Sequence, residues 1–216
     1  MNLILFGPPG AGKGTQAGKI SKQFNLQKIS TGDLLRNEIS TNTQLGKEIV
    51  SLIDKGNFVS DEIIKNLINK ILSDKSLFNR IIFDGYPRNL NQAKTLDVLL
   101  KKNNQKISIA LSLNVDRETI IKRILGRQIC EKCGEIFNKF FSPSTDYTHK
   151  CGNKFLKKRS DDNEEIISSR YETYLKKTLP IIDFYKDKKL LHEINGNSDI
   201  DEISTKIRDI IASLET

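Results

Sequence analysis

The sequence has no long hydrophobic run and no recognisable targeting segment. Of its 216 residues, 37% are hydrophobic and 29% are charged, and no apolar stretch approaches the ~20 residues that a membrane-spanning helix needs. Its first residues enter a short apolar segment at once, without the layout of a secretory signal peptide. These absences argue against a membrane protein, and we expect a cytoplasmic chain that folds as one sizeable domain, with or without small insertions.

Cysteine is scarce as well. The chain has three, at Cys130, Cys133 and Cys151. An odd number in a protein expected in the cytoplasm argues against a framework of disulfides. All three cysteines lie within one short segment, which favours a metal site.

The net charge of +8, from 35 basic and 27 acidic residues, suits either a nucleic acid or a polyphosphate ligand. Lysines are scattered over predicted helices, whereas six of the nine arginines lie near the motifs described below, where the planar guanidinium can bind phosphate with two hydrogen bonds. Aromatic residues make up only 7%, and no basic stripe alternates with stacking side chains. Polyphosphate is therefore favoured, and a basic zinc-ribbon protein that binds nucleic acid is the alternative from another functional class.

Residues 7–15 form the most informative motif, Gly-Pro-Pro-Gly-Ala-Gly-Lys-Gly-Thr, directly after the apolar run 3–6. A strand that enters a glycine-rich turn and then a helix predicts a P-loop, whose backbone N–H groups bind phosphate oxygens. Lys13 would reach the terminal phosphates and Thr15 the magnesium shell, although Gly14 stands where Ser or Thr usually follows the lysine. The predicted phosphate-binding residues are Gly10, Ala11, Gly12, Lys13, Gly14 and Thr15.

Apolar runs alternate with helical patterns, which predicts an α/β fold with a parallel sheet flanked by helices on both faces. The expected strands are 2–6, 28–30, 81–84, 107–115 and 190–194. The expected helices are 13–24, 31–40, 45–55, 60–73, 89–103, 116–125, 163–187 and 199–214. Pro180 lies inside one of these helices and should kink or divide it.

Two segments interrupt the alternation of strands and helices. Residues 31–60 hold two helical patterns without a strong strand, and residues 126–160 lose helical periodicity and gain cysteines, glycines and aromatics. We interpret both as inserts in a core made of residues 1–30, 61–125 and 161–216.

Asp84 closes the apolar strand 81–84. A carboxylate at the end of a strand is the usual partner of a P-loop in organising magnesium, and it would hold the ion through water because Mg²⁺ keeps much of its hydration.

Three motifs together resemble the adenylate kinase family: residues 7–15, Ser-Thr-Gly-Asp-Leu-Leu-Arg at 30–36, and Asp-Gly-Tyr-Pro-Arg at 84–88. The resemblance covers nearly the whole chain. It implies reversible, Mg²⁺-dependent phosphoryl transfer from ATP to AMP, giving two ADP, by a monomer. It also implies a P-loop core with a helical AMP-binding insert at 31–60 and a lid insert at 126–160.

The resemblance implies a role for each of the six arginines. Arg36 and Arg88 would bind the AMP phosphate, Arg123 would lie over the adenine of ATP, and Arg127 would bind the ATP phosphates. Arg159 and Arg170 would bind the phosphate being transferred. The residues implied to hold AMP are Thr31, Arg36, Gly85, Arg88 and Gln92, and the catalytic residues are Lys13, Arg88, Arg123, Arg159 and Arg170.

Two further interpretations of this site stay open. Gln92 lies three residues after Asn89, the spacing of a capping box, so it could serve the helix start as well as the nucleotide. Thr31 and the long insert are typical of AMP-specific members, while a UMP/CMP-type kinase is the alternative, followed by a P-loop protein that hydrolyses ATP to drive a partner.

Cys130-x-x-Cys133-Gly resembles half of the structural zinc site found in long-lid family members. The second half is incomplete, because Thr148 stands three residues before Cys151. His149 could supply the fourth ligand that zinc needs. A hydrogen-bonded polar cluster that includes Thr148 and Asp146, or three reduced thiols in a small apolar knot, are the alternatives.

Overall fold

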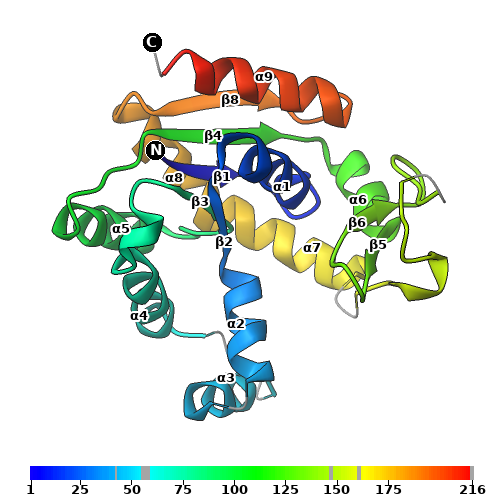
Figure 1. Ribbon diagram of the computed structural model, residues 1–216, viewed down its shortest axis with the longest axis horizontal. Helices are drawn as coiled ribbons and strands as arrows, with labels where there is room; N and C mark the ends of the chain where they lie inside the picture. Colours follow the sequence, from blue (N-terminus) through cyan, green and yellow to red (C-terminus); the bar gives the residue numbers. More distant parts are fainter. Residues whose placement is uncertain (42, 55–58, 146–147, 160–161, 215–216) are drawn as a thin grey trace. The chain divides into compact units, whose positions relative to one another are not determined.

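The computed structural model describes residues 1–41, 43–54, 59–145, 148–159 and 162–214 (Figure 1). The strands are β1 (Asn2–Phe6), β2 (Gln27–Ser30), β3 (Ile81–Asp84), β4 (Ile109–Asn114), β5 (Arg127–Cys130), β6 (Ile136–Asn138), β7 (Leu156–Lys157) and β8 (Leu191–Asn195). The α-helices are α1 (Lys13–Phe24), α2 (Thr31–Ser40), α3 (Gln44–Asp54), α4 (Asp61–Leu72), α5 (Leu90–Lys102), α6 (Arg117–Leu125), α7 (Glu164–Thr173), α8 (Leu179–Asp187) and α9 (Ile200–Ala212). Short 3₁₀ turns occupy Lys75–Leu77 and Asn153–Phe155.

Five strands form one sheet in the order β2-β3-β1-β4-β8. The pairing is parallel where β1 lies between its neighbours, with Leu3 opposite Ile82 of β3 and Ile109 of β4. Parallel strands with both faces covered are expected to be continuously apolar, and all five residues of β1 are buried. The predicted parallel α/β fold is confirmed.

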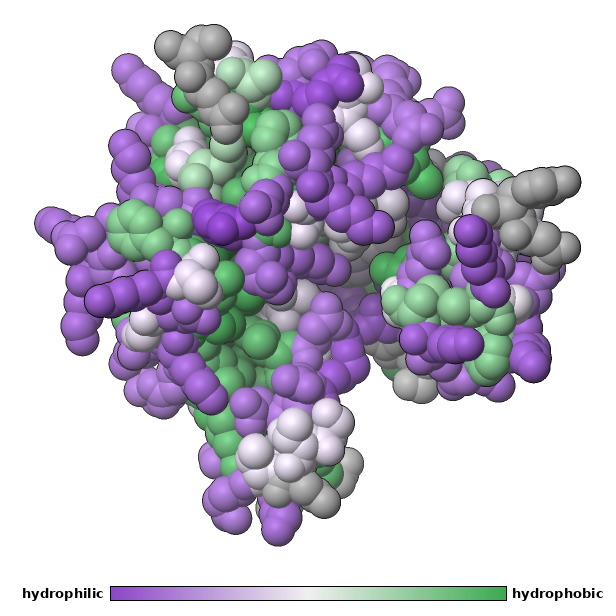
Figure 2. Space-filling view, viewed as in Figure 1, coloured by the Kyte–Doolittle hydropathy of each residue, from purple (hydrophilic) through white to green (hydrophobic). Residues whose placement is uncertain are grey.

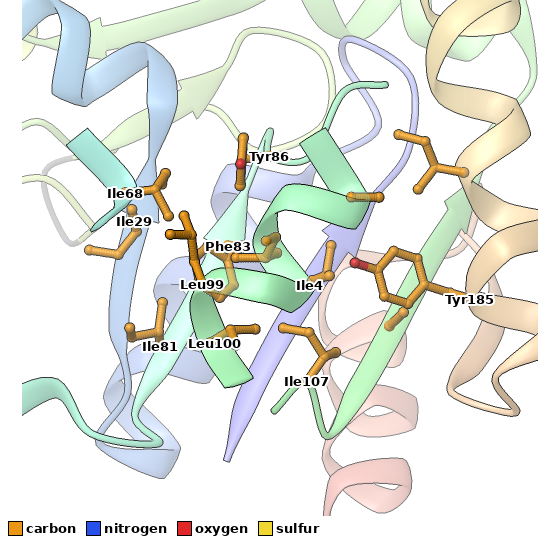
Figure 3. Packing of buried hydrophobic residues seen from close by; sticks show 14 of the residues in the cluster. Ile4, Ile29, Ile68, Ile81, Phe83, Tyr86, Leu99, Leu100, Ile107 and Tyr185 are labelled. Carbon is orange, nitrogen blue, oxygen red and sulfur yellow. The ribbon is translucent and has the colours of Figure 1, made fainter. Parts of the chain in front are cut away.

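One face of the sheet packs against α4, α5 and α8 (Figure 3). Ile4 and Phe83 from the strands meet Leu100 of α5 and Tyr185 of α8 in this cluster. Side chains alternate along a strand, so Leu3, next to Ile4, points to the opposite face, where it is equally buried. The sheet is therefore buried on both faces, and several of the predicted site residues lie at or just after the ends of its strands.

The predicted helix 163–187 is divided in the structure. A π turn at Tyr174–Thr178 separates α7 from α8, and Pro180 stands within the first two positions of α8. Proline has no N–H to donate and fits the first turn of a helix, where that donor would have no partner. The predicted division of this helix is confirmed, and the π turn is the segment at which the helix divides.

The chain forms two compact units. The first comprises residues 1–6, 17–112 and 177–192, and the second comprises 7–16, 113–176 and 193–216. The second unit contains a small antiparallel sheet in the order β6-β5-β7, for which the sequence pattern gave no strands. The boundaries 31–60 and 126–160 of the two inserts remain predictions.

Hydrophilic side chains cover most of the face of the molecule that Figure 2 displays. Within the described residues, no helix has both the length and the apolar character that a membrane crossing requires.

Candidate active site

The predicted P-loop connects β1 to α1. Gly10 and Gly12 have φ values of +81° and +90°, which side-chain-bearing residues rarely adopt, and a Cβ on Gly10 would lie 2.7 Å from the side chain of Ile124. The Nζ of Lys13 donates to the carbonyls of Gly7 at 2.7 Å and Pro8 at 2.9 Å. The loop therefore curls around an ammonium group at the start of a helix, which is an arrangement suited to phosphate oxygens.

Arg123 of α6 lies beside this loop in the second unit. One Nη donates to the carbonyl of Ala11 at 3.4 Å, and the guanidinium lies over the ring of Phe141, 5.6 Å from its centroid. Burial lowers the pKa of Arg123 while Asp116 opposes the shift, and a guanidinium stays charged at neutral pH. A flat cation and an aromatic ring thus form a stacking surface next to the phosphate-binding loop.

Asn138 of β6 holds this surface in place. Its Nδ2 donates to the carbonyl of Arg123 at 2.7 Å, and its Oδ1 accepts from the backbone N–H groups of Phe140 at 2.9 Å and Phe141 at 3.2 Å. One side chain therefore joins the end of α6 to the loop that carries Phe141.

Three more predicted phosphate-binding arginines lie in the second unit, namely Arg127, Arg159 and Arg170. Arg127, the first residue of β5, forms an ion pair with Asp162 through two hydrogen bonds. Arg159 follows β7, and its carbonyl accepts from the N–H of Asp162 at 3.2 Å. Arg170 is an exposed residue in the last turn of α7.

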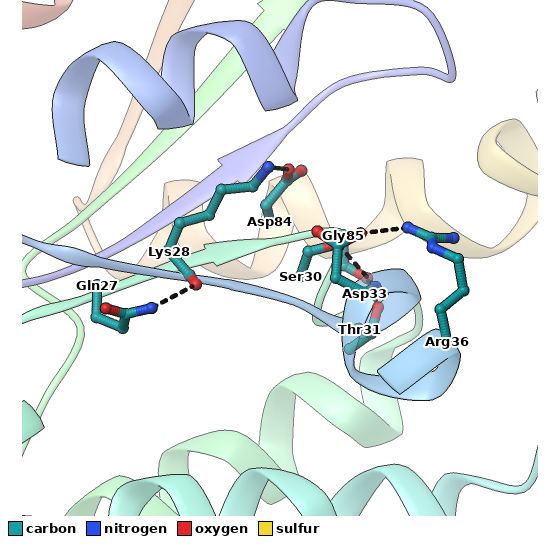
Figure 4. A network of polar contacts seen from close by, with 8 residues as sticks. All are labelled: Gln27, Lys28, Ser30, Thr31, Asp33, Arg36, Asp84 and Gly85. Carbon is teal, nitrogen blue, oxygen red and sulfur yellow. Dashed lines mark hydrogen bonds and ion pairs between the residues drawn. The ribbon is translucent and has the colours of Figure 1, made fainter. Parts of the chain in front are cut away.

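On the first unit, Thr31 and Arg88 both bond to Gly85, and Figure 4 draws the contact between Thr31 and Gly85. The hydroxyl of buried Thr31 donates to the carbonyl of Gly85 at 3.0 Å, and the Nε of Arg88 donates to the same oxygen at 2.8 Å. The ends of β2 and β3 are neighbours in the sheet, with Ser30 opposite Asp84, which explains why motifs far apart in sequence meet here.

Arg36, one turn along α2, is exposed and paired with Asp33 (Figure 4). Burial raises the pKa of Asp33, but the hydrogen bond and charge of Arg36 outweigh that effect and lower it overall. A carboxylate therefore holds the cation in the structure, and a phosphate could exchange for it because both anions accept two parallel hydrogen bonds.

Gln92 is buried in the first turn of α5, and its amide is engaged on both sides. Its Nε2 donates to Asp61 at 2.6 Å, and its Oε1 accepts from the backbone N–H of Arg88 at 2.7 Å. Asn89 caps the helix by accepting from the N–H of Gln92 at 2.8 Å. The predicted cap at Asn89 is confirmed, while the Gln92 side chain bonds Arg88 in place of the reciprocal bond of a capping box.

Asp84 ends β3, and its carboxylate lies 3.6 Å from the Nζ of Lys28 on β2 (Figure 4). An oxygen ligand at a strand end fits the preference of Mg²⁺ for carboxylates and water. The adjacent ammonium partly neutralises this charge, a feature that the sequence pattern did not reveal. The water-mediated role of Asp84 stays a prediction.

The lid cysteines and His149 form one cluster. The potential ligand atoms of Cys130, Cys133, His149 and Cys151 all lie within 4.8 Å of one another, against about 3.8 Å between sulfur ligands around tetrahedral zinc. His149 is buried, its Nε2 lies 3.8 Å from the Sγ of Cys133, and its Nδ1 is buried without a hydrogen-bond partner among the described atoms. This donor set fits zinc.

The thiols of the cluster differ in acidity. Burial acts to raise the pKa of Cys130, but backbone hydrogen bonds from Cys133 and Lys132 and the contact with His149 lower it to about 6. Burial and the neighbouring thiols raise the pKa of Cys151 to about 11. A thiolate is therefore already favoured at one corner of the cluster, as metal binding requires.

Thr148, which the alternative polar cluster includes, forms hydrogen bonds with Thr145. Its hydroxyl accepts from the N–H of Thr145 at 3.0 Å and also contacts the Thr145 hydroxyl at 3.0 Å. Asp146, the other residue of that alternative, lies outside the described residues.

Comparison with known proteins identifies the family. A family profile described as adenylate kinase matches residues 5–190. The chain belongs to the adenylate kinase family. An adenylate kinase of Pelagibacter ubique strain HTCC1062 is 50% identical over 211 residues, which cover 98% of this chain and 99% of the relative. The predicted family, the enzyme class and phosphoryl transfer from ATP to AMP are thereby confirmed.

Two other relatives match over their full length. The adenylate kinase of Archaeoglobus fulgidus is 38% identical and that of Bacillus cytotoxicus 41% identical, over 100% and 99% of this chain and 100% of each relative. Similarity over whole chains indicates that the adenylate kinase family likeness includes both the P-loop and the lid.

Five residues around the adenylate kinase motifs were not predicted from the sequence: Lys28, Asp61, Asn138, Phe141 and Asp162. Each contacts a predicted site residue that is far from it in the sequence, and no local sequence pattern reveals such a contact. Two signals were nevertheless present, namely the adjacent aromatic pair Phe140 and Phe141 before Ser142, and the carboxylate directly after the helix cap Ser60.

The remaining three arginines, Arg80, Arg117 and Arg208, are not among the predicted site residues. Arg80 donates to the carbonyl of Asn25 through Nε at 3.0 Å and Nη2 at 2.8 Å, and Arg208 contacts its neighbour Asp209. The third, Arg117, is the first residue of α6.

Proposed function

We propose that this chain maintains the balance of adenine nucleotides by reversible, Mg²⁺-dependent transfer of a phosphoryl group from ATP to AMP, as a cytoplasmic monomer. The observation that carries the proposal is two sets of cationic side chains, which we take as two anion-binding arrays. One is built on the P-loop and Lys13, and the other on Arg36 and Arg88. An enzyme that joins two phosphorylated substrates needs both.

ATP occupies the array of the second unit. Its phosphates take the hydrogen bonds that Lys13 now gives to two loop carbonyls, and Arg127 and Arg159 add positive charge. The adenine ring of ATP stacks on the surface formed by Arg123 and Phe141. Both side chains are flat, and the Arg123 guanidinium lies over the Phe141 ring.

AMP occupies the array of the first unit. Its phosphate replaces Asp33 as the partner of Arg36 and binds Arg88, while Thr31 and Gly85 shape the space around it. The amide of Gln92 contacts the base, because one of its N–H groups and one lone pair remain after the two bonds to protein.

The chemistry needs positioning and charge neutralisation more than covalent work by the protein. A phosphate oxygen of AMP forms a bond to the γ-phosphorus of ATP as the bond to the β–γ bridging oxygen breaks, which leaves ADP on each side. Thr15 and Asp84 would each contact Mg²⁺ through water, and the ion would supply further positive charge to the phosphates. Arg88, Arg159 and Arg170 stabilise the charge on the transferring group, and exclusion of water prevents hydrolysis of ATP.

We further propose that Cys130, Cys133, His149 and Cys151 hold a structural zinc ion in the lid. Such an ion would cross-link β5 to the segment that carries His149 and Cys151, and would so stabilise the fold of this part of the second unit. It takes no part in catalysis.

A coupled assay with purified protein, ATP and Mg²⁺ tests the proposal, with AMP, UMP, CMP and GMP as acceptors. Strong activity with AMP alone is expected. Activity with UMP or CMP would assign the chain to pyrimidine nucleotides, and ATP hydrolysis without any acceptor would assign the P-loop to another purpose.

A further inference from the structure

The carboxylate of Asp61 accepts hydrogen bonds from several side-chain amides at the start of α5. Its Oδ1 accepts from the Nε2 of Gln92 at 2.6 Å, and its Oδ2 accepts from the Nδ2 groups of Asn89 at 3.2 Å and Asn91 at 3.4 Å. Asp61 is the first residue of α4, directly after the cap Ser60. The contact therefore joins the beginnings of two helices that pack together in the first unit.

A buried tyrosine lies at the same corner. The hydroxyl of Tyr86 is 3.4 Å from the carbonyl of Gln92, and burial raises the pKa of Tyr86, with the negative charge of Asp61 adding to the shift. In the described part of the chain, the Asp61 carboxylate accepts hydrogen bonds from three side-chain amides, which are neutral donors.

Two opposite constraints fix the orientation of the Gln92 amide. An ionised carboxylate only accepts hydrogen bonds, so Asp61 requires the nitrogen on its side. The N–H of Arg88 only donates, so it requires the oxygen on the other side. A flipped amide would place oxygen against carboxylate and N–H against N–H, replacing two hydrogen bonds with two repulsive contacts.

The orientation matters because an amide reads purine bases by donor and acceptor pattern. Adenine presents an acceptor at N1 and a donor at its 6-amino group, which complement an amide N–H and an amide oxygen. Guanine presents a donor at N1 and an acceptor at O6, which would complement the flipped amide. If the Gln92 amide cannot flip, guanine would leave the amide and its own N1 and O6 groups without hydrogen-bond partners. Such unpaired polar groups discriminate strongly between substrates.

We infer that Asp61 is a positioning residue that locks the Gln92 amide and thereby selects adenine over guanine at the acceptor site. The inference rests on the proposed contact between Gln92 and the base of AMP. Asp61 touches no substrate itself and acts through Gln92 alone.

The test compares Asp61→Asn with Glu62→Gln in the full-length protein. Both variants remove one carboxylate from the first turn of α4, but Glu62 is exposed and pairs with Lys65. The readouts are kcat/KM for AMP, GMP and IMP, which shares the N1 and O6 pattern of guanine, together with KM for ATP.

In Asp61→Asn, the side chain can donate as well as accept, so the flipped amide becomes accessible. The ratio of kcat/KM for AMP to that for GMP, and likewise for IMP, should fall about tenfold, as expected for loss of one oriented hydrogen bond. KM for ATP should stay within about twofold of wild type. Glu62→Gln should leave all ratios unchanged.

An equal loss of activity with all three acceptors in Asp61→Asn would overturn the inference, because a merely structural residue gives that result. If Asp61→Asn does not fold, the pair Asp61→Glu and Asp61→Gln answers the same question at matched length. The ratio should then fall only in Asp61→Gln, and equal ratios in the pair would refute the role. Wild-type protein without activity on AMP would refute the proposed function itself.

Discussion

Arg127 and Asp162 form an ion pair in which the guanidinium donates through two nitrogens, with Nε 2.9 Å from Oδ2 and Nη2 bonded to Oδ1. The carboxylate is almost fully buried, at 1% exposure, and the arginine side chain is 19% exposed. Two parallel bonds to a buried carboxylate fix the orientation of the guanidinium. Arg127 is thus held at the start of β5, where the lid sheet begins.

Replacement of Asp162 by Asn should therefore destabilise the protein. The change leaves a largely buried cation without its counter-charge, which costs about 2–3 kcal/mol in the free energy of unfolding. Urea unfolding, followed by circular dichroism, measures this. Asp209→Asn is the matched control, because Asp209 pairs with exposed Arg208 and its loss should change stability by less than about 0.5 kcal/mol. Equal stability of both variants would contradict the structural role of the buried pair.

Arg88→Ala should reduce turnover by at least about 100-fold, because it removes a cation proposed to stabilise the transferring phosphate. The fold should stay intact, since the Arg88 side chain is exposed and its backbone N–H, which bonds Gln92, is retained. Steady-state kinetics and circular dichroism check both parts. Arg208→Ala, another exposed arginine, should keep the wild-type rate, and a near-normal rate in Arg88→Ala would exclude the role.

The parts of this molecule that sequence analysis predicted are those whose pattern is local. β1 and β3 appear at their predicted residues because strands buried on both faces are continuous apolar runs, and the cap at Asn89 follows from a short polar side chain at a helix start. Residues 7–15 were recognisable because glycine spacing reflects the backbone conformation that the loop requires.

Other features depend on contacts between distant residues. β6 and β7 have only three and two residues, too few for an alternating pattern to emerge. The bond from Gln92 to Asp61 joins residues 31 positions apart, and the bonds from Arg127 to Asp162 join residues 35 apart. Side-chain identity alone cannot distinguish such partners from ordinary surface carboxylates, so these relationships required the tertiary structure.

The lid cluster makes a prediction about metal content. Purified protein should contain about one zinc per chain, as a closed structural site with four ligands implies. Removal by a strong chelator should lower the melting temperature. His149→Gln should lose most of the metal, whereas His192→Gln, which changes the other histidine in the chain, should keep it. Elemental analysis and thermal melting measure these outcomes, and full zinc content in His149→Gln would remove that residue from the ligand set.

The contact between Arg123 and Phe141 predicts a selective effect on the donor nucleotide. Phe141→Ala removes the ring over which the Arg123 guanidinium lies, and a cation–π contact at a partly exposed site contributes about 0.5–1 kcal/mol. Together with lost stacking on adenine, worth about 1–3 kcal/mol, this should raise KM for ATP by about tenfold or more. KM for AMP should not change, because the AMP array is built from other residues.

Phe140→Ala is the matched control for this prediction. Phe140 is 61% exposed and adjacent in sequence, and its backbone N–H bonds the same Asn138 oxygen as that of Phe141. A truncated side chain leaves that backbone bond intact, so KM for ATP should rise less than in Phe141→Ala. Initial rates at varied ATP and saturating AMP give the comparison. If both variants raised KM for ATP and KM for AMP together, the ring of Phe141 would act on lid stability and not on adenine.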